Sequence, residues 1–472
     1  MRIRLDHTYT AEELAHVTNG RMIGTGQGAT HLTTDSREVE PGDLFVALRG
    51  ETIDGNHYVA DAARRGAAIL LAERNTNNAA CTVCVPDTWQ ALGLLAGAAR
   101  ARIAPTVIGI TGSAGKTTTK NMIAAVLESG FRTHKTQKNQ NNFLGLCLTL
   151  LSMPTDTEML VVEMGMNHAG EIAALSRIAT PDIAVITNIG RAHIGNLGSR
   201  AGIAAAKAEI LQGCSPGALC LIPAGEPLLE KAIPDGLHIM RIGERPGCDC
   251  RYKTVSMGSN TTLADFLCHT VSYEAIPLPG IGRHLTICAA FALMVGQTLG
   301  IPQGKICRAL STVKNEAMRQ EILRKNGITV IVDCYNASPE STRAACETLR
   351  TMARETGGRG LALLGDMMEL GEETRKLHEE IGAYYAEQGV DLLFTFGAAA
   401  ENIGTGARRA GMPAERIYSN PDPASPQASA AQINAVLRPG DVLLIKASRA
   451  MAGERIVSYL HFPNTEEKEA TK

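Results

Sequence analysis

The sequence predicts an α/β protein of three domains, and three features lead to this prediction. The chain has 472 residues, which is too long for one ordinary hydrophobic core and is typical of about three domains. Apolar strand-like runs alternate with helix-like segments along most of the chain, as in parallel, doubly wound sheets. A glycine-rich turn that joins a strand to a helix near Gly112 indicates a phosphate site.

The composition excludes several classes of protein. Hydrophobic residues make up 44% and charged residues 20%, and the net charge of −2 predicts no surface for nucleic acid or an anionic membrane. No run reaches the roughly 18 apolar residues of a membrane span, and the first residues lack the apolar core of a signal peptide. We therefore expect a cytoplasmic protein, with a monomer as the default state.

Residues 1–102 are expected to form a small α/β domain. A Pro-Gly-Asp turn leads into an apolar strand at residues 44–48. A helix at 58–65 and a strand at 68–72 follow.

Residues 103–313 are expected to form the central domain. A strand at 106–110 enters the glycine-rich turn, and a helix at 117–127 leaves it and ends before Gly130. Further strands are expected at 159–163, 183–187 and 218–222. Short β-like runs over 252–276 predict an antiparallel addition, and the helix that follows Gly282 closes the domain near Val313.

Residues 314–472 repeat the α/β rhythm and predict a Rossmann-like domain. Its strands are expected at 329–332, 360–364, 392–395 and 442–446, each followed by a helix. No G-x-G-x-x-G pattern follows the first strand, so we do not expect a dinucleotide ligand.

Twelve cysteines are scattered along the chain. Cys81 and Cys84 have metal-ligand spacing, but no second such pair completes a tetrahedral site. We expect reduced cysteines that serve as small apolar residues.

The turn after residue 110 has the residues of a shortened P-loop. Backbone N–H groups of such a turn converge on phosphate oxygens at the positive end of the following helix. Lys116 is placed to reach the β- and γ-phosphates, and Thr117 to ligate Mg²⁺. An ordinary glycine-rich βα turn is the alternative, and Ile110 stands where the strict pattern has glycine. The expected phosphate-binding residues are Gly112, Ser113, Ala114, Gly115, Lys116, Thr117 and Thr118.

Three polar residues downstream suggest a second part of the site. Glu163 ends an apolar strand and suits a Mg²⁺ ligand, or else a capping or salt-bridged carboxylate. His193 follows the next strand, and a structural hydrogen bond is its plainer role. Lys207 lies among alanines on a helix, where a solvated face is the plainer reading.

These motifs together resemble the Mur ligases in identity, order and rough spacing, over essentially the whole chain. The matching strings are residues 111–118, 139–145, 163–165, 188–195, 207–209 and 333–337. The resemblance implies an ATP-dependent amide-bond ligase of peptidoglycan synthesis, and thus of cell shape and cell division. In such ligases ATP phosphorylates a substrate carboxylate, and an amine then attacks the acyl phosphate.

The resemblance also implies cofactors and catalytic residues. The cofactors are ATP and Mg²⁺. Lys116, His193 and Lys207 would be catalytic, and Lys207 would carry a carbamate that shares a second Mg²⁺ with Glu163 and His193.

Further residues are implied for ATP and for the substrates. Arg319 and Asp333 would contact phosphate and ribose, with Asn336 beside them. Residues 35–55 resemble the domain that holds the UDP end of the substrate, although a turn-rich connection is the alternative for any single residue. Residues 365–371 and 446–449 resemble the branch that adds D-alanyl-D-alanine to UDP-N-acetylmuramoyl-tripeptide. The implied substrate-binding residues are Ser36, Arg37, Gly50, Asp54, Asn141, Asn142, Asp366, Glu369, Lys446, Ser448 and Arg449.

One departure concerns the adenine end of the site. Leu285 and Cys288 stand where the family has two asparagines that help to hold adenine, so those contacts are not carried over. The alternatives are a diaminopimelate- or lysine-adding Mur ligase, a folylpolyglutamate synthase, or a P-loop ATPase without ligase activity. The Asp-Asn-Pro-Arg signature of the first is missing, and the set Glu163, His193 and Lys207 argues against the last.

Overall fold

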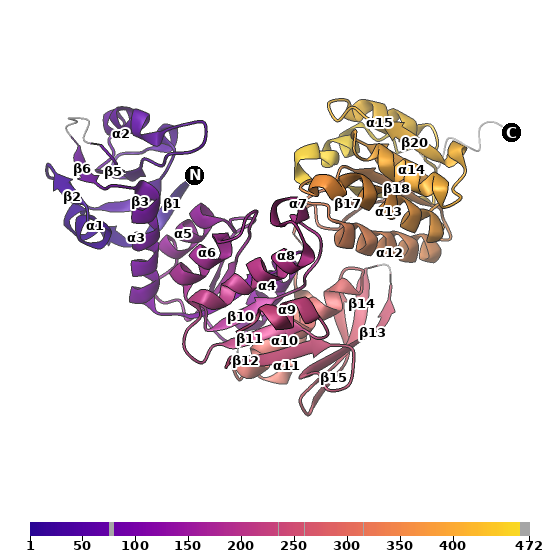
Figure 1. Ribbon diagram of the computed structural model, residues 1–472, viewed down its shortest axis with the longest axis horizontal. Helices are drawn as coiled ribbons and strands as arrows, with labels where there is room; N and C mark the ends of the chain where they lie inside the picture. Colours follow the sequence, from indigo (N-terminus) through magenta and orange to yellow (C-terminus); the bar gives the residue numbers. More distant parts are fainter. Residues whose placement is uncertain (75–79, 235, 259, 315, 463–472) are drawn as a thin grey trace.

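The computed structural model describes residues 1–74, 80–234, 236–258, 260–314 and 316–462. Three α/β domains follow one another along the chain, each built around its own sheet (Figure 1). The predicted fold class is therefore confirmed. The strands of the three sheets fall within residues 2–84, 106–279 and 321–446.

The first domain is a six-stranded mixed sheet in the order β1-β3-β4-β5-β6-β2. Its strands are β1 (Arg2–Tyr9), β2 (Arg21–Ile23), β3 (Ala29–Thr33), β4 (Leu44–Val46), β5 (Ile69–Ala72) and β6 (Cys81–Cys84). Helices α1 (Ala11–Thr18), α2 (Val59–Arg64) and α3 (Thr88–Ile103) complete it. Asp87 caps α3 by accepting hydrogen bonds from the N–H groups of Trp89 and Gln90.

The central sheet has nine strands in the order β15-β14-β13-β12-β11-β10-β7-β9-β8. The parallel strands are β7 (Thr106–Thr111), β8 (Thr133–Lys135), β9 (Met159–Glu163), β10 (Ile183–Ile186), β11 (Leu219–Pro223) and β12 (His238–Gly243). Strands β9 and β10 are apolar and buried along their length up to Glu163 and Ile186, which is the pattern of parallel strands covered on both faces.

Helices cover both faces of this sheet. Helices α4 (Lys116–Glu128) and α10 (His284–Thr298) pack together on one face, where α11 (Gln303–Thr312) adjoins them. The remaining helices are α5 (Phe143–Leu151), α6 (Glu171–Ala179), α7 (Ile194–Leu197), α8 (Arg200–Ala208) and α9 (Pro227–Ala232).

The predicted antiparallel addition consists of β13 (Cys250–Met257), β14 (Thr261–Cys268) and β15 (Val271–Pro279). Cys250 and Cys268 are directly opposite each other in β13 and β14 and form a disulfide. The expectation of reduced cysteines is therefore wrong for this pair, because strand register brings together two residues that are 18 positions apart.

The third sheet has the order β16-β17-β21-β18-β19-β20. Strands β17 (Ile328–Asp333), β18 (Gly360–Gly365), β19 (Leu392–Phe396), β20 (Ile417–Asn420) and β21 (Val442–Lys446) are parallel, and β16 (Glu321–Lys325) is an antiparallel edge. The helices are α12 (Pro339–Thr356), α13 (Thr374–Glu387), α14 (Glu401–Arg409) and α15 (Pro426–Asn434).

Three details of the third domain differ from the prediction. Strands β16 and β20 were not expected from the sequence. The last strand, β21, is followed by short 3₁₀ helices rather than an α-helix. The prediction of a helix after every strand is wrong here, because Gly453 and the left-handed Ala452 (φ 46°) prevent a continuous α-helix soon after β21.

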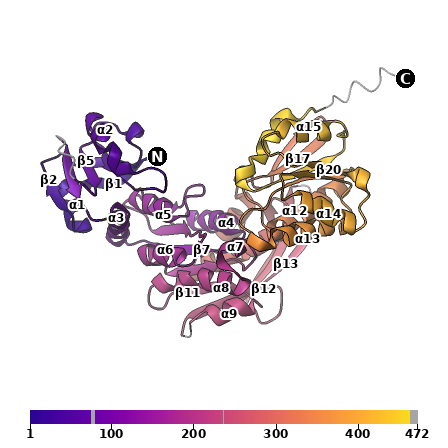
Figure 2. The ribbon, with the colours of Figure 1, turned by 45° about the horizontal axis from the view of Figure 1, so that its top comes forward.

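The three domains form a V, with the central domain at its base (Figures 1 and 2). Within the described residues, no helix is both long and apolar enough to cross a membrane.

The joint between the first two domains is apolar. Helix α3 packs against α5 and α6, and one continuous cluster of buried hydrophobic residues runs from the first sheet into the central one. Gly93 lies at this joint, where an added Cβ atom would lie 3.0 Å from Phe143 Cζ and 3.4 Å from Ile178 Cδ1. The two domains therefore share a hydrophobic core.

The substitution Gly93→Leu tests this joint. Because its side chain has no room between α3 and α5, we expect a loss of about 1–3 kcal/mol of stability and a lower melting temperature. Gly97→Leu on the same helix is the control, since no described atom beyond its chain neighbours and the backbone of α3 lies within 4 Å of a Cβ added there. Because leucine has a higher helix propensity than glycine, this variant should gain up to about 1 kcal/mol of stability. Equal melting temperatures for the two variants would contradict the shared core.

Candidate active site

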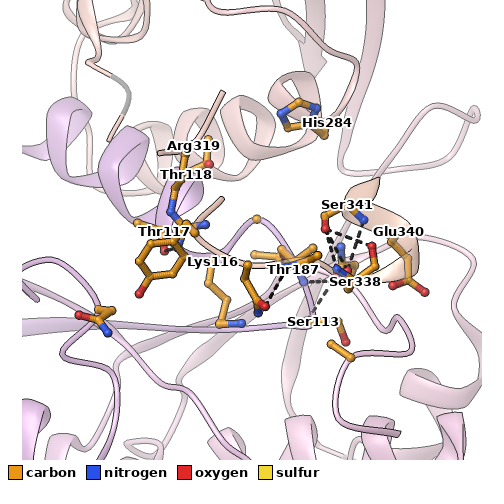
Figure 3. A pocket seen from close by; sticks show the side chains of 18 of the residues that line it. Ser113, Lys116, Thr117, Thr118, Thr187, His284, Arg319, Ser338, Glu340 and Ser341 are labelled. Atoms are coloured by element: carbon orange, nitrogen blue, oxygen red, sulfur yellow. Dashed lines mark hydrogen bonds between the residues drawn. The ribbon is translucent and has the colours of Figure 1, made fainter. Parts of the chain in front are cut away.

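A cavity of about 650 Å³ lies between the central and third domains, at the carboxyl end of β7. Residues of the glycine-rich turn line one part of it, and residues of the third domain line another (Figure 3). The predicted residues among the lining are Ser113, Ala114, Gly115, Lys116, Thr117, Thr118, Asn141, Glu163, His193, Arg319, Asp333, Asn336, Glu369, Lys446, Ser448 and Arg449.

The glycine-rich turn forms a concave row of backbone donors. The N–H groups of Ser113 and Ala114 donate to Asn188 Oδ1 at 3.0 and 2.9 Å. Gly112 has φ 148°, and a Cβ atom there would lie 1.9 Å from Thr187 Oγ1, so only glycine fits. The first N–H groups of α4 have no partner within the helix and carry its positive end, which suits phosphate oxygens.

Lys116, the first residue of α4, folds back over this turn. Its ammonium donates to the carbonyl of Gly112 at 2.7 Å. Burial lowers the pKa of Lys116, and the charge of Arg319 adds to this effect while Glu163 opposes it. The amine of Lys116 lies beside the glycine-rich turn, where the charge of a phosphate would favour its protonated form.

Glu163 is a buried carboxylate at the end of β9, with 2% of its surface exposed. Thr117 Oγ1 donates to it at 2.9 Å, and Asn141 Nδ2 donates at 2.8 Å. Strands β7 and β9 are parallel neighbours with Ile110 opposite Glu163, which is why the turn and the carboxylate meet. Glu163 and Thr117 together offer the hard oxygen ligands that Mg²⁺ prefers.

His193 precedes α7 and has φ 64°, in the left-handed region. Its Nδ1 atom pairs with a carboxylate oxygen of Glu369 from the third domain. This contact lowers the pKa of Glu369. The backbone continues the same contact, because the N–H of Gly195 donates to the carbonyl of Glu369 at 3.1 Å.

Lys207 is fully buried on α8, and its Nζ atom has no hydrogen-bond partner among the described residues. Burial lowers the pKa of Lys207 well below the ordinary value, and the charge of Lys116 lowers it further. The alternative of a solvated face for Lys207 is thus excluded, because the side chain is fully buried. Lys207 does not itself line the cavity.

The described part of the chain holds no cluster of three His, Cys, Asp or Glu side chains that could bind a metal ion. The predicted set contributes only Glu163 and His193 to such a count, and the third member is a lysine. The unmodified amine of Lys207 is a poor ligand for Mg²⁺, so this set fits a second ion only if Lys207 bears an acid group.

The third domain supplies cations and polar groups to the cavity. Arg319 donates to Thr117 Oγ1 at 2.9 Å, and its guanidinium lies 3.9 Å from the ring centre of Tyr335. Asp333 and Lys446 face each other in β17 and β21 and form an ion pair of 2.7 Å. The predicted dipeptide residue Lys446 and the predicted ribose residue Asp333 are thus neighbours in the same cavity.

Several predicted residues lie outside the cavity lining. Asn142 caps α5 by accepting from the N–H of Gly145 at 2.9 Å. Asp366 accepts from the N–H of Ala400 at 2.7 Å. Gly112 lies in the glycine-rich turn, where its positive φ sets the backbone conformation, but it does not line the cavity. Ser36, Arg37, Gly50 and Asp54 belong to the first domain and are not among the cavity-lining residues.

In the first domain, these residues lie in turns and short helices. Ser36 is buried, and the exposed Arg37 pairs with Asp35, whose pKa it lowers to about 2. Asp54 accepts from the N–H of Asn56 at 2.9 Å and thereby caps a 3₁₀ turn.

Sequence reasoning missed several residues of the site. Asn188 accepts hydrogen bonds from the N–H groups of Ser113 and Ala114. Glu340 of α12 accepts from the N–H of Arg191 at 2.9 Å. Lys120 is buried one turn beyond Lys116 on α4, a spacing that could have drawn attention to it. Glu316 and Tyr335 also line the cavity. Only the fold brings most of these side chains to the cavity.

The cavity has an apolar section beside the turn. It is lined by Met122, Leu285, Ile287, Cys288, Phe291 and Val313. Cys288 Sγ lies 3.9 Å from the carbonyl of Gly115, and burial raises the pKa of this thiol to about 11. The two positions that depart from the family pattern therefore present apolar surface close to the phosphate site.

Three family models match the chain. The Mur ligase family catalytic domain matches residues 29–131, the Mur ligase middle domain matches 110–296, and the Mur ligase glutamate ligase domain matches 318–449.

Individual proteins are similar over nearly the full length. The UDP-N-acetylmuramoyl-tripeptide–D-alanyl-D-alanine ligase of Bacillus subtilis is 37% identical over 96% of this chain and 98% of its own. A crystal structure of MurF from Acinetobacter baumannii aligns with a TM-score of 0.88 and 30% identity, over 97% of this chain and 99% of that one. The MurF ligase of Thermotoga maritima in complex with ADP aligns with a TM-score of 0.81 and 31% identity, over 91% and 96%.

The contact between α7 and the third domain can be tested by Gly195→Ala. The added Cβ would lie 2.6 Å from the backbone N of Gly371, so the two domains must separate locally. We expect turnover to fall by about tenfold or more, because residues from both domains line the cavity. Small-angle X-ray scattering should show a larger radius of gyration.

Gly304→Ala in α11 serves as the control, since no described atom beyond its chain neighbours and the backbone of α11 lies within 4 Å of its added Cβ. If both variants keep wild-type turnover and the same scattering profile, the contact at Gly195 has no role in holding the domains together.

Proposed function

The chain belongs to the Mur ligase family, and we propose that it joins D-alanyl-D-alanine to UDP-N-acetylmuramoyl-tripeptide while cleaving ATP to ADP and phosphate. One observation carries the proposal. The phosphate-binding turn, the Glu163 carboxylate and the cations of the third domain line one cavity between two domains. Relatives named as this ligase support the choice of substrates.

The reaction needs two transfers at one place. The γ-phosphoryl group of ATP passes to the terminal carboxylate of the tripeptide, which gives an acyl phosphate. The amine of the dipeptide then attacks the carbonyl carbon, the amide bond forms, and phosphate leaves with the electron pair of the broken C–O bond. The protein does not need a nucleophile of its own.

Residues of the cavity would stabilise the charge that develops in these steps. The backbone N–H groups of the glycine-rich turn and the ammonium of Lys116 would hold the phosphates. For Ser113 and Ala114 this requires that the phosphate replace Asn188 as the acceptor. Arg319 would reach them from the third domain, with Asp333 and Asn336 beside the ribose. Bound Mg²⁺, held by Thr117 and Glu163, would neutralise part of the charge on the phosphoryl oxygens.

Lys207 fits the carbamate that the family resemblance implies. A neutral amine is the form that adds to CO₂, and burial lowers the pKa of Lys207, which favours that form. A carbamate would supply an anionic oxygen ligand where the unmodified residue offers none. Glu163 and His193 are the proposed partners.

The domains would divide the substrates among themselves. We assign the UDP end to Ser36, Arg37, Gly50 and Asp54 of the first domain. Asn141 and Asn142 would lie along the path of the tripeptide. The dipeptide would bind to the third domain, where the cavity is lined by Glu369, Lys446, Ser448 and Arg449, with Asp366 behind them.

This activity belongs to peptidoglycan synthesis, and through it to cell-wall growth, cell shape and cell division. We propose a cytoplasmic enzyme that works as a monomer.

ADP release by the purified protein tests the activity. With ATP, Mg²⁺ and UDP-N-acetylmuramoyl-tripeptide, we expect steady ADP formation only after D-alanyl-D-alanine is added, and mass spectrometry should show the pentapeptide. Each substrate left out in turn is the control. ADP formed at the same rate without the dipeptide, and without product, would mean that the protein is an ATPase and not this ligase.

The variant Lys207→Ala tests the carbamate. We expect turnover to fall by about 100-fold or more, and added bicarbonate not to restore it. Independently of activity, ¹³C NMR with labelled bicarbonate should show a carbamate signal that is absent from the variant. The exposed Lys305→Ala should keep both signal and turnover. Near-wild-type turnover of Lys207→Ala would exclude the proposed role.

A further inference from the structure

The connection between the central and third domains lies on the helix that begins at the phosphate site. Thr117, Lys120 and Asn121 are spaced i, i+3 and i+4 on α4 and therefore share one face of the helix. Glu316 and Arg319 of the connection contact this face, and Figure 3 shows Arg319 beside Thr117 and Thr118.

Lys120 is the buried centre of these contacts, with 1% of its surface exposed. Its Nζ atom lies 3.3 Å from Glu316 Oε1, 3.2 Å from the carbonyl of Lys138 and 3.9 Å from Glu163 Oε2. Asn121 Nδ2 donates to the same Glu316 oxygen at 3.0 Å. Of the two carboxylates, Glu316 is the one within hydrogen-bond distance of the lysine.

The connection itself is strained on both sides of Arg319. Met318 has φ 59° and Gln320 has φ 53°, and neither is glycine. Left-handed backbone costs about 1–2 kcal/mol for such residues, and it persists only where the surroundings hold it. A short connection would otherwise relax and carry Arg319 away from α4.

Contacts from two domains hold this strained turn. On the third-domain side, the N–H of Tyr335 donates to the carbonyl of Met318 at 3.2 Å, and the Tyr335 ring lies under Arg319. On the central side, Glu316 is the anchor, and Lys120 is the cation that binds it. Without Lys120, Glu316 would face the buried Glu163 with less positive charge between them, which is unfavourable at low dielectric.

We propose that Lys120 is a positioning residue for the ligase reaction. Through Glu316 it holds the strained turn from Met318 to Gln320 in place, so that Arg319 stays at Thr117 and the nucleotide phosphates. The role of Arg319 at the phosphates rests on the proposed function, whereas the anchoring of the turn does not.

Kinetics of three single variants and two double variants test this role. Lys120→Met and Glu316→Ala should each lower kcat and raise KM for ATP, so that kcat/KM for ATP falls by about tenfold or more in each variant. KM for the UDP substrate should stay unchanged in both. The double variant of Lys120→Met and Glu316→Ala should have a kcat/KM for ATP no lower than that of the more impaired single variant. Lys120→Met should also add nothing to Arg319→Ala. Additive losses in either pair would overturn the proposal, since Lys120 would then act independently of the connection.

Lys135→Met is the matched control. Lys135 forms an ion pair of 3.1 Å with Glu128 at the other end of α4, outside the cavity lining. The Lys135→Met variant should leave KM for ATP unchanged. A comparable rise in that KM would show that any lost ion pair on α4 has this effect, which would also overturn the proposal.

Hydrogen exchange on the full chain without substrates separates this proposal from the proposed function. In Lys120→Met, the amide of Tyr335 and the peptide that contains Arg319 should exchange about tenfold faster, because the turn loses its anchor. Lys120→Arg, which keeps the charge, should recover part of the protection. Unchanged exchange in a folded Lys120→Met protein would refute the anchoring, whatever reaction the enzyme catalyses.

Discussion

One hydroxyl group joins the three parts of the cavity. Thr117 Oγ1, in the first turn of α4, donates to Glu163 at the end of β9 and accepts from Arg319 of the third domain. This is possible because β7 and β9 are parallel neighbours whose carboxyl ends meet at one edge of the sheet. The buried carboxylate of Glu163 and the guanidinium of Arg319 thus each come within hydrogen-bond distance of the same hydroxyl at the positive end of α4. A nucleotide and a divalent cation are the ligands that such an arrangement suits.

The two joints between domains are physically different. The first and central domains share a hydrophobic core through α3, and separating them would expose apolar surface to water. The third domain contacts the central one through polar groups at the cavity, such as His193 with Glu369, Arg191 with Glu340, and Arg319 with Thr117. Fewer apolar residues, Ile194, Met257 and Ile281, join its core. Water can replace each of these polar contacts at a net cost of about 0.5–1.5 kcal/mol, or somewhat more where a charged group is involved.

The glycine-rich turn was the most predictable part of the candidate site, because its donors are backbone groups whose arrangement depends on a local pattern of glycines, Lys116 and Thr117. Glu163 and His193 were also predictable as strand-end residues, since parallel strands deliver their carboxyl ends to one edge. Lys120 and Glu316 were not predictable in the same way, because 196 positions separate them and each alone reads as an ordinary surface charge. The disulfide between Cys250 and Cys268 and the strands β16 and β20 depend on register and on an available sheet edge.

The sequence by itself determined the α/β class, the three successive domains, the glycine-rich turn between β7 and α4, and the family. These follow from periodicity and from motifs whose residues are neighbours along the chain. Only the tertiary structure decided that Lys207 is buried without a partner, that Asp333 is paired with Lys446, and that Arg319 is delivered to Thr117. The physical reason is that burial and the pairing of charges depend on the three-dimensional positions of residues that are far apart in the sequence. They arise when packing brings distant segments together and removes water from between them.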